Sequence, residues 1–362
     1  MTILDNRALN RATLERQLLL QRADRTAIDA VNHLVGMQAQ EPLEPYAGLH
    51  SRLTHFRPQE LVDLLESRRA VRTLLMRRTI HLVSAEDCLL LRPLHQAMIV
   101  SRMWNVLKRP LDGVDLEELA AAGLPIFERE PTTLPEAGRA VAERFPGKAP
   151  RDLGDALSSV LPLLQVPPRG LWGRKGPAKN TTIQRWLGRQ VVAQENAADE
   201  LILRYLRAYG PAAGADIRAW SGLTGLPEVI KRVRPMLRTF RDERGRELLD
   251  VADGALPDPE TPAPPRFLPA FDNAVLGFDD RARIIDRQFR GLSVAGARFL
   301  LVDGRVAGTW TVDATGESTT LRIAYLVKVV GESADAVVAE GERLLELYEG
   351  DAARRRVVAD GP

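Results

Sequence analysis

The sequence lacks the features that mark several classes of protein. Its single cysteine, Cys88, excludes an intrachain disulfide, offers no metal-binding spacing and lies among leucines, so a buried and inert thiol is expected. No apolar run approaches the ~18 residues that span a bilayer. Residues 1–7 do not have the basic and then apolar pattern of a signal peptide. The composition, 45% hydrophobic and 27% charged, is typical of a globular protein. We therefore expect a cytoplasmic, nucleoid-associated location and roughly two to four structural units.

The charge is nearly balanced overall but unevenly distributed. The formal net charge is +2, yet residues 68–78 hold five arginines and no acid. Residues 156–194 contain no acid at all, and residues 231–246 hold seven basic residues against two acids. A protein that binds a polyanion on one face has this kind of segregation. Solvated basic surfaces without a partner are also common, so one cluster alone does not decide the matter.

The same order of elements recurs three times: a run of helices followed by a basic two-stranded hairpin. In the first block we predict helices at residues 13–21, 26–35, 46–53 and 58–66, with strands at 71–75 and 79–83. In the second we predict helices at 116–127, 133–144 and 151–161, then a strand at 164–166 and a Gly- and Pro-rich basic segment at 167–176. In the third we predict helices at 199–209, 214–221 and 227–238, with strands at 238–241 and 247–251.

Three helices and a β-hairpin make a winged-helix unit. One helix of such a unit often enters a DNA groove while the hairpin reaches the backbone. Winged helices also mediate contacts between proteins, so one unit would not establish a function. Three units in tandem, each with a basic hairpin, favour DNA binding.

The composition changes after residue 251. Residues 256–269 contain six prolines and are predicted to form an extended linker. Strands at 283–285, 298–302, 306–312 and 320–325, followed by a helix at 333–348, predict a small barrel or a strongly bent sheet. The predicted fold class is α+β, with three winged helices at residues 1–84, 85–195 and 196–255 and a C-terminal β-barrel domain at 256–362.

Two glutamines, Gln38 and Gln40, lie two residues apart in the segment that joins two helices near the N-terminus. In an extended stretch, residues i and i+2 point to the same side, so both amides could face one point. An amide pair can hold a water molecule, but it cannot take up a proton as a carboxylate does. The alternative is a loop at a helix end with two solvated amides.

These features together resemble a known family. Tandem winged helices, Gln38-Ala39-Gln40 after the second helix, and the segment Leu268-Pro269-Ala270-Phe271-Asp272-Asn273 … Asp280-Arg281 are similar to the AlkZ/YcaQ-like winged-helix DNA glycosylases. The resemblance covers essentially the whole chain. The motif places it with the Gln-x-Gln branch, which includes self-resistance glycosylases of antibiotic producers, the azinomycin B type among them.

The resemblance implies a C-shaped arrangement of three winged helices with a β-barrel and double-stranded DNA in the concavity. It also implies hydrolysis of the N-glycosidic bond of N7-alkylated purines, including bulky adducts and interstrand crosslinks, by a monomer without metal or organic cofactor. Gln38 and Gln40 would be the catalytic residues. No lysine adjoins the motif to form a Schiff base, which predicts a monofunctional enzyme. The competing interpretation is a transcriptional regulator that binds DNA through its winged helices without catalysis.

The basic residues expected to contact DNA come from three places in the chain. They are Arg77 and Arg78 in the first hairpin, Arg174, Lys175 and Lys179 in the second, and Arg281 and Arg283 at a hairpin-like strand that lies near the lesion in the resembling family. The alternatives are solvated hairpins and, for the last two, a structural ion pair with Asp279 or Asp280. Packing is the simpler interpretation for His33, Trp172 and Trp186.

Overall fold

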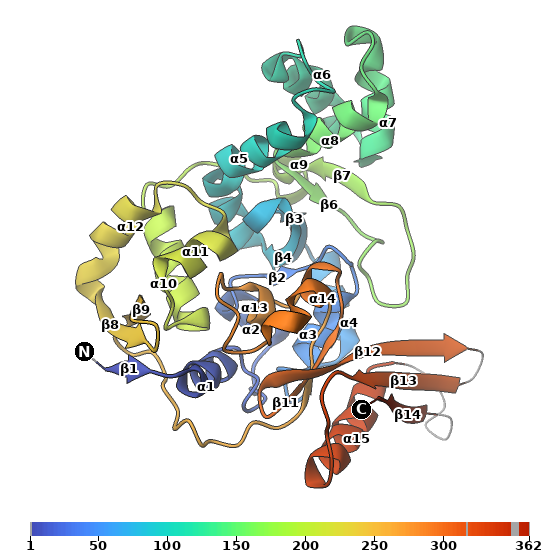
Figure 1. Cartoon of the computed structure of the whole chain (residues 1–362). Coiled ribbons are helices and arrows are strands. Elements are labelled where there is room, and N and C mark those ends of the chain that lie inside the picture. Colours follow the sequence, from blue (N-terminus) through green and yellow to red (C-terminus); the bar gives the residue numbers. More distant parts are fainter. Residues whose placement is uncertain (1, 316–317, 349–354, 362) are drawn as a thin grey trace.

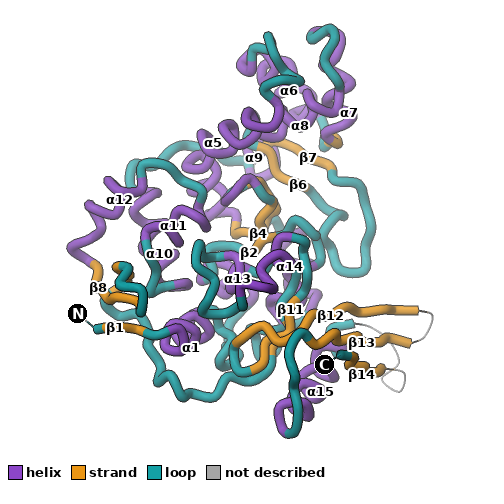
Figure 2. The backbone as a smooth tube through the Cα atoms, viewed as in Figure 1, coloured by secondary structure: helices purple, strands orange, loops and turns teal. Residues whose placement is uncertain are grey.

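The computed structural model describes residues 2–315, 318–348 and 355–361. It is a mixed α+β structure in which helices and strands alternate along the chain (Figure 1). Figure 2 shows that most helices lie outside the C-terminal part, which contains the longest strands. No helix in the described ranges is long and apolar enough to cross a lipid bilayer.

The first group of elements follows the predicted order. Asp5 and Thr26 cap its first two helices, because their side chains accept hydrogen bonds from the backbone N–H groups of Ala8 and Asp29. The group consists of α1 (Asn6–Arg16), α2 (Ala27–His33), α3 (Glu44–His50), α4 (Pro58–Glu66), β3 (Ala70–Leu74), the turn Met76–Arg78 and β4 (Ile80–Ser84).

A helix of 23 residues, α5 (Ala85–Leu107), leads from the first group into the second. The sequence patterns above did not predict it, although Ser84 caps it by accepting a hydrogen bond from the N–H of Asp87. Cys88, in its first turn, is fully buried, and burial raises the pKa of its thiol to about 12. The expectation of a buried cysteine is therefore confirmed.

The second group also follows the predicted order. Thr133 and Glu136 form a reciprocal capping pair, with each side chain accepting from the other residue's backbone N–H. The elements are α6 (Leu116–Arg129), α7 (Leu134–Val141), α8 (Pro150–Val160), β6 (Leu163–Gln165), β7 (Lys179–Thr182) and α9 (Ile183–Leu187). The Gly- and Pro-rich segment forms the long loop that joins β6 to β7 (Figure 1).

The hairpins of these two groups belong to one six-stranded sheet, with the strand order β2-β4-β3-β6-β7-β5. Its outer strands are the short β2 (Met37–Gln38) and β5 (Thr132–Thr133). Strand β3 pairs with β6 in antiparallel register, and Arg72 lies opposite Gln165. The shared sheet fixes the position of the first hairpin relative to the second group, which no local pattern in the sequence predicted.

The third group is tied to the N-terminus. It consists of α10 (Ala197–Tyr209), α11 (Gly214–Ser221), α12 (Leu226–Val233), β8 (Leu237–Asp242) and β9 (Glu247–Val251). The two-residue strand β1 (Ile3–Leu4) pairs in parallel with β8. The first residues of the chain therefore extend the sheet of the third group.

The predicted C-terminal barrel is wrong. Across the described residues the strands form an open sheet in the order β10-β11-β12-β13-β14. Helix α15 (Glu332–Leu345) buries Val337 and Leu344 in the same cluster as Leu321 and Ile323 of the sheet. A helix thus covers the apolar face that closure into a barrel would otherwise bury. The strands are β10 (Arg266–Phe267), β11 (Phe299–Val302), β12 (Arg305–Thr315), β13 (Ser318–Tyr325) and β14 (Arg355–Asp360).

The strand predicted at residues 283–285 is also wrong. Residues 282–284 form a turn that lies between the short helices α13 (Asn273–Leu276) and α14 (Arg290–Val294). Ile284 and Ile285 are fully buried, so their apolar character reflects packing in a turn and not a place in a sheet.

A buried ion pair holds the C-terminal part against the first group. The guanidinium of Arg52, at the end of α3, donates to both carboxylate oxygens of Asp272 at 2.8 and 2.9 Å, and both side chains are at most 3% exposed. Removing one member of such a pair costs about 3–5 kcal/mol, because the other charge is left buried and unpaired. The contact places residues 268–273 beside the segment that carries Gln38.

Candidate active site

Gln38 and Gln40 lie on either side of Ala39 in a short segment that pairs with β4. Gln38 ends β2 and lies opposite His81 of β4, and the backbone N–H of Ala39 donates to the carbonyl of Ile80 at 2.8 Å. Ala39 is fully buried between the two glutamines, whereas Gln38 is half-buried and Gln40 is exposed. This alternation of burial is what an extended backbone imposes.

Arg77 anchors the amide of Gln38. Its guanidinium donates to Gln38 Oε1 at 2.7 Å, to Asn273 Oδ1 at 3.0 Å and to the carbonyl of Trp220 at 3.0 Å. None of these three acceptors is a carboxylate. Burial lowers the pKa of Arg77 to about 10, so the group stays protonated at neutral pH. The cation therefore ties Gln38 to two other parts of the chain.

The turn that carries Arg77 has an unusual backbone. Arg77 and Arg78 both have positive φ, 58° and 60°, a region that residues with a side chain seldom occupy. Each such residue costs of order 1 kcal/mol and persists only where surrounding contacts hold it. Here those contacts are the hydrogen bonds of Arg77 and the ion pair of Arg78 with Asp155 at 2.6 Å.

The side chain of Gln40 is held by the backbone of strand β4. Its Oε1 accepts a hydrogen bond from the N–H of Ile80 at 3.2 Å. A guanidinium and a backbone N–H only donate, so in both glutamines the oxygen must be the atom that faces the hairpin. Each Oε1 keeps a second lone pair, and neither Nε2 has a partner among the described residues.

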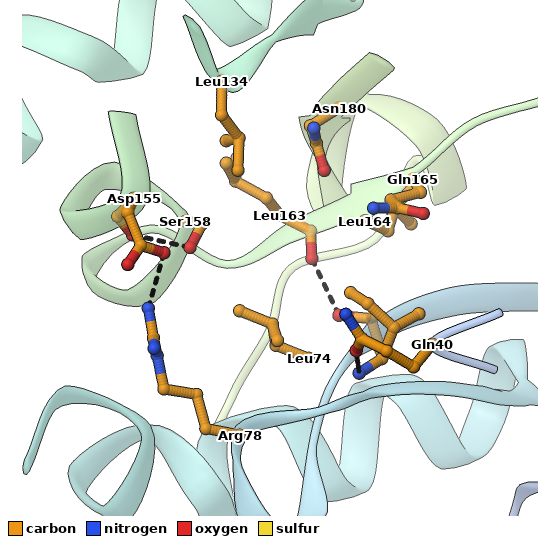
Figure 3. Close-up of a pocket in the computed structure, with 12 residues that line it drawn as sticks. Gln40, Leu74, Arg78, Leu134, Asp155, Ser158, Leu163, Leu164, Gln165 and Asn180 are labelled. Carbon is orange, nitrogen blue, oxygen red and sulfur yellow. Dashed lines mark hydrogen bonds and ion pairs between the residues drawn. The ribbon is translucent and has the colours of Figure 1, made fainter. Parts of the chain in front are cut away.

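The two glutamines line different cavities. Gln38 borders a small pocket between the first group and residues 269–273, beside Gln17 and Tyr209. Gln40 borders a cavity of about 220 Å³ between the first hairpin, α8 and strands β6 and β7. Figure 3 shows this cavity, with the ion pair of Arg78 and Asp155 at one side. The amides are neighbours, but they do not converge on one enclosed space.

Sequence reasoning missed the residues that support Gln38. Asn273 and Asp272 lie more than two hundred positions away in the chain, and Arg52 pairs with the latter. One available signal was that an acid and an amide stand side by side in the otherwise apolar run 268–276. Such polar residues, once buried, need partners, but the sequence does not say which.

The basic residues expected to contact DNA occupy unlike environments. Lys175 and Lys179 are exposed, and Arg174 is exposed beside Glu66, with which it pairs at 3.0 Å. Arg77 and Arg78 turn toward the protein, as described above. Arg281 is half-buried and donates to Ser293 Oγ at 2.9 Å.

Arg283 lies in the interior. It is 2% exposed, stacks over the ring of Phe278 at 4.2 Å and donates to the carbonyl of Pro211 at 3.0 Å. As placed, Arg283 is out of reach of a phosphate. The alternative considered for both arginines, an ion pair with Asp279 or Asp280, is not formed either, because Arg244, Arg246 and Arg290 hold Asp280.

Histidines near the site do not supply a base at neutral pH. His81 is fully buried, and burial, followed by the charge of Arg77, lowers its pKa to about 3. His33 Nε2 donates to the carbonyl of Arg16 at 2.7 Å, and the ring lines a pocket that neither glutamine borders. Within the described ranges, no cluster of three or more His, Cys, Asp or Glu could hold a metal ion.

The comparison with protein families decides the general class of this chain. Residues 31–347 match the model described as DNA glycosylase AlkZ-like. The chain belongs to the AlkZ-like family of DNA glycosylases.

A solved structure agrees with this membership at the level of the fold. The DNA glycosylase AlkZ of Streptomyces sahachiroi superposes with a TM-score of 0.79 over 100% of both chains, at 19% sequence identity. No curated protein sequence matches the chain. The resemblance derived from the motifs is thus confirmed for the family, and DNA is the substrate of a family of this kind.

Proposed function

We propose that this protein is a monofunctional DNA glycosylase that hydrolyses the N-glycosidic bond of N7-alkylated, cationic purines, including bulky or crosslinked ones. The proposal rests on the anchored pair Gln38 and Gln40. Both carbonyl oxygens are fixed by donors on one hairpin. Side chains held in this way are preorganised to position a small molecule such as water.

The chemistry of the substrate fits two neutral amides. An N7-alkylpurine already bears a positive charge, so its departure needs no protonation. The transition state resembles an oxocarbenium ion attacked by water, as in glycoside hydrolysis. The free lone pair of each Oε1 can accept a hydrogen bond from that water, and the oxygen dipoles favour the developing positive charge. The hydrogen bond from Arg77 fixes the orientation of the Gln38 amide for this task.

The surroundings of the pair support selectivity for a charged leaving group. His81, which neighbours Gln38 in the sheet, has too low a pKa to act as a base at neutral pH. Intact guanine, which departs poorly without protonation, should therefore be spared. No lysine lines either cavity beside the glutamines in the described structure, which favours hydrolysis without a Schiff base and without lyase activity.

The second hairpin is the best-placed surface for the DNA backbone. Lys175, Lys179 and Arg174 are exposed on the loop that follows β6 and at the start of β7. Exposed lysine and arginine side chains bind phosphates without preference for a DNA sequence. We therefore assign phosphate contacts to these three residues, and we expect the protein to act as a monomer.

The deciding experiment is excision from a duplex with one N7-methyl-deoxyguanosine. Wild-type protein should release the base and leave an abasic site. Gln38→Ala/Gln40→Ala should slow release by about 100-fold or more, the scale of losing a preorganised polar group at a transition state. Gln59→Ala, which changes an exposed amide on α4, serves as the matched control. Duplex affinity of all three proteins should agree.

The outcomes separate an enzyme from a regulator. Loss of excision in the double variant with retained binding supports the glutamine pair. A wild-type protein that releases no base from the methylated duplex or from duplexes with bulky or crosslinked N7 adducts, yet prefers one DNA sequence strongly, would be a regulator.

A further inference from the structure

The cavity beside Gln40 has the lining of a site for a flat ring system with polar edges. Leu74, Leu134 and Leu163 supply apolar walls, while Gln40, Gln165 and Asn180 supply amides. The volume, about 220 Å³, is below the ~300–1,000 Å³ typical of sites for drug-sized ligands. It suits one heterocyclic ring system and excludes a stack of bases.

The amides of this cavity have unused hydrogen-bonding capacity. Gln165 Oε1 is buried without a partner, and its side chain forms no hydrogen bond with the residues that the structure describes. Asn180 uses only its Nδ2, which donates to the carbonyl of Ala178 at 3.0 Å. Gln40 uses only its Oε1. Buried polar groups in proteins are nearly always paired, so an unpaired amide facing a cavity indicates a missing partner.

The register of the sheet explains why these amides meet. Gln165 and Asn180 lie directly opposite each other on the antiparallel strands β6 and β7, so their side chains share one face. Gln40 reaches the same cavity from the segment that follows β2, held by Ile80 of β4. Figure 3 shows the three amides and the leucines around one space.

The charges of the cavity exclude a phosphate. Its only ionic side chains, Arg78 and Asp155, neutralise each other at 2.6 Å. Arg78 is further held by Ser159 Oγ at 3.1 Å. An anion would gain no free cation there. A purine, in contrast, has apolar faces for the leucines and donor and acceptor edges for the amides, which pair well with base edges.

We infer that this cavity receives the alkylated purine after it has rotated out of the duplex. The inference rests on the proposed glycosylase function and adds a base-binding site to it, with Gln165 as a residue that reads the base edge. An alkylated base pairs weakly and so costs less to extrude than an intact one. A base tied to the opposite strand cannot leave the stack, so this route serves monoadducts.

The substitution Gln165→Leu tests the site with little risk to folding, because this side chain makes no hydrogen bond that the change would break. Gln184→Leu, which alters an exposed amide on α9, is the matched control. Thermal unfolding should show the same midpoint for wild type and both variants. The first probe is free 7-methylguanine, with binding followed by saturation-transfer NMR and calorimetry.

Wild type and Gln184→Leu should bind 7-methylguanine, and Gln165→Leu should bind it about ten-fold more weakly, the scale of one lost bidentate base contact. The second readout is a duplex with a hydrolysis-resistant 2′-fluoro N7-methyl-deoxyguanosine beside 2-aminopurine. Extrusion should raise 2-aminopurine fluorescence with wild type and not with Gln165→Leu.

The failures of the two proposals differ. If wild type excises the methylated base but Gln165→Leu does so equally fast, with equal fluorescence, the base site is wrong and the glycosylase stands. If wild type binds 7-methylguanine through Gln165 but excises no alkylated base, the site stands and the glycosylase is wrong. No binding of 7-methylguanine at millimolar concentration, with no fluorescence rise, overturns the base site outright.

Discussion

The first and second hairpins carry the same kind of charge but direct it differently. In the first, Arg77 turns inward and gives its guanidinium to three oxygens from three parts of the chain. In the second, Lys175 and Lys179 are exposed and form no ion pair within the described residues. Oxygen acceptors hold the guanidinium of Arg77, whereas the side chains of Lys175 and Lys179 face solvent.

This contrast shows that a basic run in a sequence indicates the charge of a segment, but not whether its side chains turn inward or face solvent. A guanidinium leaves water only where hydrogen bonds replace its solvation. Asn273 and the carbonyl of Trp220 supply those bonds beside the first hairpin, and Lys175 has no such partner in the part of the chain that the structure describes. We therefore assign the first hairpin to the support of Gln38 and the second to DNA affinity.

The largest expected effect is the loss of Arg77. The substitution Arg77→Ala releases Gln38 Oε1, so the amide no longer has a fixed orientation. We expect the single-turnover excision rate at saturating protein to fall by about 100-fold, with the duplex Kd changed by less than about three-fold. The latter limit follows because three of the five N–H groups of the Arg77 guanidinium already donate to protein oxygens.

Rescue distinguishes a positioning role from a merely structural one. Millimolar guanidinium should restore part of the excision rate of Arg77→Ala, because the ion can occupy the vacated position. Arg68→Met, an exposed arginine at the start of the same hairpin, is the control and should excise normally. A large loss of duplex affinity in Arg77→Ala with a normal excision rate would show that the inward orientation of Arg77 does not persist on DNA.

The second effect is a loss of stability at low pH, which His81 in the first hairpin should cause. The second hairpin contains no histidine, so this effect is confined to the first. Burial lowers the pKa of His81 to about 3, below the ordinary value of 6.5. Above pH 6.5 neither the folded nor the unfolded state binds the proton, and stability is complete. Between pH 6.5 and 3 only the unfolded state binds it, so stability falls as the pH falls. At pH 4.5 the loss for His81 is roughly 3 kcal/mol.

Urea unfolding at pH 7 and pH 4.5 measures this loss. His81→Asn should reduce the difference in unfolding free energy between the two pH values by a similar amount. His55→Asn should not, because His55 is exposed. An unchanged pH dependence in His81→Asn would mean that His50 and His95, whose pKa burial lowers to about 4, account for acid sensitivity.

The sequence predicted the features that depend on neighbouring residues better than those that depend on partners distant in the chain. The helices with capping residues, such as those beginning after Thr26 and Thr133, lie near their predicted positions because caps and apolar spacing act within one turn. The barrel was wrong because closure depends on partners distant in the chain. The parallel pairing of β14 with β13 has no local signature, whereas apolar spacing did predict the helix that covers the sheet as α15.

The same limit applied to the candidate site. Spacing alone predicted that Gln38 and Gln40 share a face, since it follows from the geometry of extended backbone. It could not predict that Arg77 reaches Asn273, which is 196 positions away. It also could not predict the cavity, because strands β3 and β6 come from different groups and meet only in the shared sheet.

Removing the cations of the second hairpin should have a moderate effect on affinity and none on chemistry. For Arg174→Ala/Lys175→Ala/Lys179→Ala we expect the slope of log Kd against log salt to decrease by about 2–3, at ~0.9 per phosphate contact. The excision rate at saturating protein should equal that of wild type. Fluorescence anisotropy across a salt series measures the slope. A normal slope with slower excision would reverse the roles assigned to the two hairpins.

The smallest effect tests whether the second hairpin is free to bind. Arg174 pairs with Glu66, and the two side chains are 59% and 44% exposed. Exposed pairs of this kind contribute ~0–1 kcal/mol, so Glu66→Gln should barely change the free energy of unfolding. It should tighten duplex binding by less than about three-fold, because it removes a competitor for Arg174 and one negative charge near the phosphates. Equilibrium binding at low and physiological salt detects this change, which should disappear when Arg174→Ala is also present. A gain that survives in the double variant would come from the lost charge alone and would remove Arg174 from the phosphate-binding surface.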